Sequence, residues 1–147
     1  MNPKFIKTSR YLLMAILLLL IVQYILGMIV NIYALPPYGS NISAHMVMGY
    51  VVALIGLITL IFVIFSRQVG AISFSAIGFV SIVLAGQSGR GFAFFSQQNG
   101  VYSLAMALFW LLSFSSYFIS LFLISSRYTK NNTKDKGEGQ PARGGAS

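Results

Sequence analysis

The chain has no cysteine, and only 2 of its 147 residues are acidic. Without cysteine it cannot form disulfides, thiolate metal sites or iron–sulfur clusters, and it has no thiol nucleophile. Its one histidine is His45, and its two carboxylates, Asp135 and Glu138, lie close to the end of the sequence. Few groups therefore remain for general acid–base or nucleophilic catalysis. The composition does not favour an enzyme.

Charge of either sign is also scarce. Charged residues make up 8% of the chain and hydrophobic residues 56%, whereas a soluble globular domain carries about 25% charged residues. The length suits a single domain. Such a composition predicts a protein that folds in a lipid bilayer, with lipid as its first partner.

Four long stretches contain no Lys, Arg, Asp or Glu, and they span residues 11–33, 44–66, 71–88 and 101–126. A helix of about 20 apolar residues, at about 1.5 Å per residue, crosses a hydrocarbon core of about 30 Å. Pro36 and Pro37 end the first stretch because neither donates a backbone hydrogen bond. We therefore predict an all-α integral membrane four-helix bundle with up-down-up-down topology.

Nine of the ten basic residues lie on one side of this predicted bundle. They lie before the first apolar stretch, between the second and third, and after the fourth. Only Arg90, between the third and fourth, lies on the other side. Because cytoplasmic segments are enriched in Lys and Arg, we predict that both termini are cytoplasmic in the cell membrane, and that the charges have no nucleic-acid role. The nine are Lys4, Lys7 and Arg10 in a basic leader (1–10), Arg67 between the second and third stretches, and Arg127, Lys130, Lys134, Lys136 and Arg143 in a tail (127–147) expected to be disordered.

Small and polar residues recur about one helical turn apart within the stretches. Small residues let helix backbones approach closely in lipid, and polar side chains there hydrogen-bond to neighbouring helices. We expect these positions to pack helices together, within the chain or against another membrane protein or a second copy. They are Gln23, Gly27 and Asn31 in the first stretch, Gly49, Ala53 and Gly56 in the second, and Ser81 and Ala85 in the third.

A second interpretation concerns His45, which opens the second stretch. A neutral imidazole can ligate a metal, and Met28 and Met106 are expected at a similar depth in their helices. Arg90 is the one basic residue on that side. These four residues would supply an axial nitrogen, an axial thioether and a partner for propionates, so they are candidates for a haem site.

Three short patterns resemble a known family. They are Gln23-x-x-x-Gly27-x-x-x-Asn31, His45 at the start of the second stretch, and Ala85–Gly86 followed by Gly89–Arg90. Together they resemble one four-helix half of the haem A synthase type of membrane protein. The run from Gln23 to Met28 is also similar to the first helix of small prokaryotic membrane proteins with a Gln-x-x-Leu-Gly-Met pattern. The resemblance implies a four-helix bundle and a haem on His45, whereas the absence of histidine in the fourth stretch calls for a different second ligand.

Three functions follow from these patterns. The first is a non-catalytic accessory or structural subunit, or an assembly factor, of a membrane complex. The second is a haem-binding membrane protein related to one half of haem A synthase. The third is a passive channel or small-solute carrier, lined by Gln23, Asn31 and the serines of the third stretch.

Overall fold

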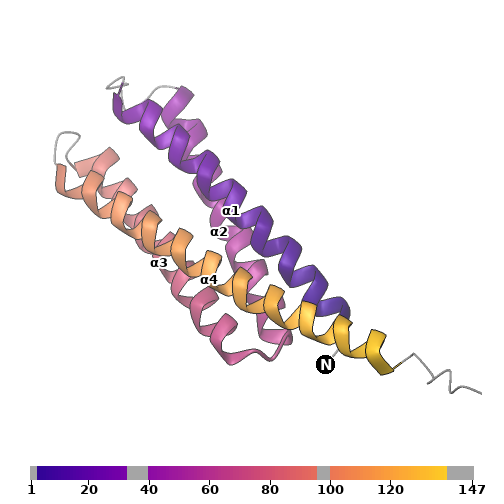
Figure 1. Cartoon of the computed structure of the whole chain (residues 1–147). Helices are drawn as coiled ribbons and strands as arrows, with labels where there is room; N and C mark the ends of the chain where they lie inside the picture. The colour runs from indigo at the N-terminus through magenta and orange to yellow at the C-terminus, as the bar shows by residue number, and fades with distance from the viewer. Residues whose placement is uncertain (1–2, 33–39, 96–99, 139–147) are drawn as a thin grey trace, which may run out of the picture.

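The computed structural model of the chain describes residues 3–32, 40–95 and 100–138. This part is all-helical, as predicted, and it contains four helices: α1 (Pro3–Ile32), α2 (Ser40–Phe65), α3 (Val69–Phe95) and α4 (Gly100–Glu138) (Figure 1). Each helix includes a segment that is long and apolar enough to cross a bilayer: Lys4–Val30, Ile42–Phe65, Val69–Gly91 and Gly100–Thr129. The four helices indicate a multi-pass membrane protein.

Several helices extend beyond the predicted stretches. α1 begins at Pro3, within the predicted leader, since a proline in the first turn of a helix lacks only an N–H that would be unpaired there. α3 continues to Phe95, seven residues beyond the end of the predicted stretch 71–88. α4 continues to Glu138, so residues 127–138 are helical where disorder was predicted. Adding a residue to an existing helix is much easier than nucleating one, and lysine is a good helix former. The Pro36–Pro37 turn and residues 139–147 lie outside the described residues.

The four helices surround a common interior. α1 packs against α2 and α4, and α3 packs against the same two helices, with the most extensive contact between α3 and α4. Figure 1 shows α1 beside α2 and α3 beside α4, each pair antiparallel, with α4 reaching past its neighbours at the end where α1 begins. This arrangement makes two helix pairs, α1–α2 and α3–α4.

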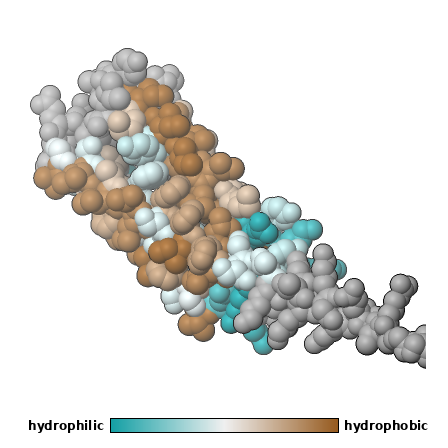
Figure 2. All heavy atoms as spheres, in the orientation of Figure 1, coloured by the Kyte–Doolittle hydropathy of each residue, from teal (hydrophilic) through white to brown (hydrophobic). Residues whose placement is uncertain are grey.

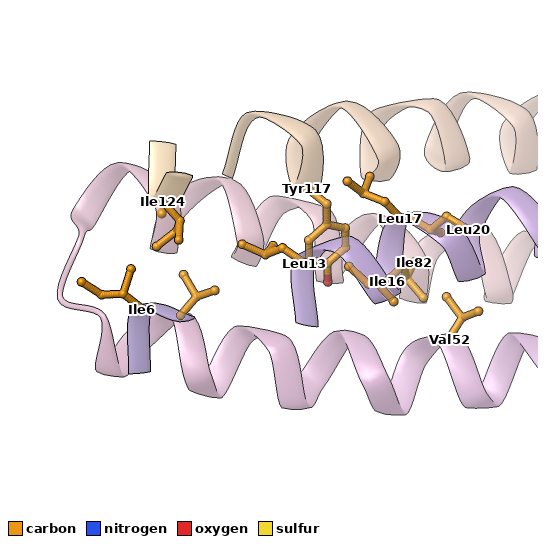
Figure 3. Packing of buried hydrophobic residues seen from close by; sticks show 11 residues of the cluster. Ile6, Leu13, Ile16, Leu17, Leu20, Val52, Ile82, Tyr117 and Ile124 are labelled. Carbon is orange, nitrogen blue, oxygen red and sulfur yellow. The ribbon is translucent and has the colours of Figure 1, made fainter. Parts of the chain in front are cut away.

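Apolar side chains from all four helices fill the interior (Figure 3). The largest fully buried side chain is that of Tyr117 on α4. Large apolar side chains also cover the outside, where Leu18 is 65% exposed and Phe122 is 66% exposed. An apolar surface of this extent suits lipid rather than water. The buried cluster comprises Ile6, Leu13, Ile16, Leu17, Leu20, Val52, Val63, Ala71, Ile82, Tyr117 and Ile124.

Hydrophilic residues gather at one end of the molecule, the end where α1 begins (Figures 1 and 2). We call this the basic end, defined by Lys4, Lys7, Arg10, Arg67 and Arg127. A short turn joins α2 to α3 there, closed by hydrogen bonds from the backbone N–H groups of Ser66 and Arg67 to the carbonyls of Val63 and Ile64, each 3.0 Å. The opposite end carries His45, in the second turn of α2, and Arg90, near the end of α3.

Candidate functional site

Two polar side chains meet between α1 and α2 towards the end opposite the basic end. The Gln23 side-chain amide donates a hydrogen bond of 3.2 Å to the backbone carbonyl of His45. The same nitrogen lies 3.5 Å from Nε2 of the His45 ring. The two residues form a polar contact across the α1–α2 pair, which we call the Gln23–His45 site.

Two glycines make room for this contact. A methyl group at Gly27 would lie 3.1 Å from Cε1 of His45, and one at Gly49 would lie 3.3 Å from Nε2 of Gln23. Glycine therefore lets the imidazole pack directly against α1 and the amide against α2. The structure brings together four residues that the sequence singled out, Gln23 and Gly27 from α1 and His45 and Gly49 from α2.

Two polar atoms of the Gln23–His45 site have no hydrogen-bond partner among the described residues. They are Oε1 of Gln23 and Nδ1 of His45, and both atoms are buried. Buried polar atoms are almost always paired, in many cases with ordered water. The site therefore encloses an acceptor oxygen and a ring nitrogen between α1 and α2.

The four haem candidates lie on four different helices, and the contacts of two of them are defined. His45 is turned towards Gly27 within the α1–α2 pair, whereas the sulfur of Met106 lies against Gly89 in the α3–α4 pair, 3.1 Å from where a methyl group there would stand. Met28 is 38% exposed, and Arg90 is exposed. The two proposed axial ligands thus contact different helix pairs, and haem binding by His45 stays a prediction.

Most of the other predicted packing residues lie in or beside the core, and one has a side chain outside the described residues. Gly56 accommodates the Tyr117 hydroxyl, which would lie 3.0 Å from a methyl group there. Ser81 is buried and donates a 2.8 Å hydrogen bond to the carbonyl of Ile77. Ala53 packs against the core cluster, and Ala85 is half-buried. Asn31 belongs to α1, but its side chain lies outside the described residues.

Other polar contacts across helices were not predicted as pairs. The hydroxyls of Ser75 and Ser120 lie 2.8 Å apart, and Ser120 also donates to the carbonyl of Ala71 at 3.0 Å. The Trp110 indole N–H donates to the carbonyl of Leu20 at 2.8 Å. The polarity of these positions marks them as inward-facing, but their partners depend on the axial offset of the helices.

Within the part of the chain that the structure describes, no three His, Asp or Glu side chains are grouped as metal ligands. Comparison with protein-family models, curated proteins and solved structures gives no match for this chain. The function must therefore be argued from the residues and their contacts.

Proposed function

We propose that this chain is a multi-pass protein of the cell membrane with both termini cytoplasmic, an up-down-up-down bundle that serves as a non-catalytic accessory or structural subunit, or an assembly factor, of a membrane complex. The nine-to-one distribution of basic residues supports the orientation. The structural observation that supports a partner is on the outer face of α3.

That face exposes a glycine and a glutamine within the membrane-spanning segment. Gly86 and Gln87 are both exposed, and a methyl group at Gly86 would meet nothing within 4 Å. A face in contact with lipid gains nothing from glycine or glutamine. At a contact with another helix, glycine permits close approach of the backbones, and the glutamine amide can hydrogen-bond to the neighbouring helix. The outer face around Gly86 and Gln87 is therefore the surface where we expect the partner helix.

The polar groups inside the bundle support a structural role. The amide of Gln68 donates to the carbonyl of Leu123 at 3.1 Å, linking the α2–α3 turn to α4. The Ser9 hydroxyl donates to the carbonyl of Phe62 at 3.0 Å, linking α1 to α2. Such hydrogen bonds fix helices against one another, and a rigid four-helix unit is suited to supporting a larger assembly.

The test uses the full-length chain, tagged and extracted from its native membrane in mild detergent. Native mass spectrometry is expected to show a complex of defined stoichiometry that is heavier than the monomer. Gly86→Leu should release the partner, because the larger side chain prevents close approach, and Gln87→Leu should weaken the complex. The matched control is Val80→Leu, at a 54% exposed position of the same helix.

A monomer as the sole species from native membranes would contradict the proposal. So would a Gly86→Leu variant that assembles as well as Val80→Leu. A side chain at Gly86 enters open space, so Gly86→Leu and Val80→Leu should both keep the thermal stability of the wild type. Loss of the complex in Gly86→Leu can then be assigned to the outer face of α3.

A second candidate function is haem binding through His45. The observation in its favour is the buried and unpartnered Nδ1 atom of that ring. Purified protein saturated with haem should show a Soret band that disappears in His45→Ala. A colourless, folded preparation after haem saturation would exclude this candidate and leave the accessory role untouched.

A further inference from the structure

Three segments that carry an arginine each, the start of α1, the α2–α3 turn and α4 itself, adjoin one another at the basic end. The guanidinium carbon of Arg10, on α1, lies 5.7 Å from the centroid of the Tyr128 ring on α4. Arg127 is the residue immediately before Tyr128. The contact therefore fixes the start of α1 beside the turn of α4 that carries Arg127.

The α2–α3 turn reaches the same part of α4. Gln68, next to Arg67, donates its side-chain hydrogen bond to the carbonyl of Leu123, and a methyl group at Gly70 would lie 3.2 Å from a Leu123 methyl. Leu123 precedes Arg127 by one helical turn. Arg67 and Arg127 thus come from backbone segments that adjoin each other.

No acidic residue lies close in the sequence to Arg10, Arg67 or Arg127. Arg67 and Arg127 are exposed and Arg10 is half-buried. The only acidic residues of the chain, Asp135 and Glu138, lie in the last turns of α4, and Asp135 is about 12 Å further along the axis than Arg127 at 1.5 Å per residue. Figure 2 shows the hydrophilic surface at this end. Three arginines on adjoining segments favour an anion.

The geometry points to a binding site for the phosphate of an anionic phospholipid headgroup, held by Arg10, Arg67 and Arg127. A guanidinium group matches phosphate oxygens with two parallel hydrogen bonds. The apolar segments of α2 and α4 end at Phe65 and Thr129, so Arg67 and Arg127 lie at the depth of the headgroups. The site requires the four helices to lie in a bilayer, but it does not depend on the accessory role.

Arg67 offers a variant that separates binding from folding. Its φ is 53°, in the left-handed region, and no other described non-glycine residue has a positive φ. Glycine adopts this conformation without a steric cost. Arg67→Gly therefore removes a cation from the site while the turn keeps its backbone geometry.

The experiment measures lipid retention by the full-length protein in detergent, using native mass spectrometry with added phosphatidylglycerol or phosphatidylcholine. The wild type should retain phosphatidylglycerol in preference to phosphatidylcholine. Arg67→Gly and Arg127→Gln should each lower phosphatidylglycerol retention about fivefold, as expected for one basic group at an anionic surface. Phosphatidylcholine retention should not change.

Arg90→Gln is the matched control, because it removes one charge at the opposite end. Its phosphatidylglycerol retention should equal that of the wild type. Equal retention of the two lipids by the wild type would overturn the site, as would an equal loss in Arg90→Gln, which would indicate a general charge effect. Displacement of the lipid by glycerol 3-phosphate at the same concentration would also overturn it, because the site would then take soluble phosphates.

Discussion

The ring of Tyr117 on α4 lies directly on Gly78 of α3, where a methyl group would be 2.9 Å from Cε2 of the tyrosine. The hydroxyl of the same side chain reaches across the interior to α2, 3.5 Å from the carbonyl of Gly56. One fully buried tyrosine thus contacts both α2 and α3 through glycines. This arrangement explains how α3 and α4 approach closely around a large aromatic side chain.

Gly78→Ala is therefore expected to destabilise the bundle by about 1–3 kcal/mol, the usual cost of overpacking a core. The ring has little room to move, because Tyr117 is fully buried. Thermal unfolding in detergent, followed by circular dichroism, would measure the change. Gly86→Ala is the matched control on the same helix, where the added methyl group meets open space. Equal stability of the two variants would show that Tyr117 does not pack as described.

The Gln23–His45 site predicts a coupling between Gly27 and His45. Gly27→Ala should destabilise the protein by about 1 kcal/mol, because the new methyl group would stand 3.1 Å from the imidazole. In a His45→Ala background the same substitution should cost nothing, since the ring is gone. A double-mutant cycle of unfolding free energies measures this coupling. Additive effects would mean that the ring does not lie against Gly27.

The hydrogen bonds of Ser120 link α3 to α4, and their loss should be measurable. Ser120→Ala removes the contacts with Ser75 and with the Ala71 carbonyl, for an expected cost of about 0.6–1.7 kcal/mol. The control is Ser126→Ala, because the Ser126 hydroxyl is exposed and bonds only within its own helix, to the carbonyl of Phe122. A Ser120→Ala variant as stable as this control would contradict the inter-helix bonds.

The orientation can be tested with single cysteines, because the chain has none of its own. Arg90→Cys should react with a membrane-impermeant maleimide added to intact cells, whereas Arg127→Cys should react only after permeabilisation. Both positions are exposed, so reactivity will report sidedness rather than burial. Labelling of Arg127→Cys in intact cells would place the basic end outside and reverse the proposed topology.

The helices could be predicted from the sequence because each apolar stretch has about the length that a helix needs to cross the hydrocarbon core of a bilayer. Their ends were less predictable. Gly89 and Gly91 suggest a loop, yet in α3 they give space to Met106 and Tyr102 of α4. That packing depends on which helix lies opposite, and a local pattern does not contain this information.

The candidate site shows the same division. The four-residue spacing placed Gln23 and Gly27 on one face of α1, and His45 was singled out as the only histidine. Their mutual contact depends on how α1 is rotated and shifted against α2, which periodicity does not determine. The Tyr117–Gly78 contact was missed for this reason, although both residues are visible as unusual members of apolar stretches.

The uninterrupted course of α4 has a mechanical consequence. Its apolar segment ends at Thr129 and the helix ends at Glu138. About 14 Å of helix therefore extends beyond the apolar segment. The residues after Thr129 and the buried Tyr117 belong to one continuous helix, and Tyr117 packs against Gly56 and Gly78. A load on the projecting part of α4 would therefore act on the same continuous helix that carries Tyr117.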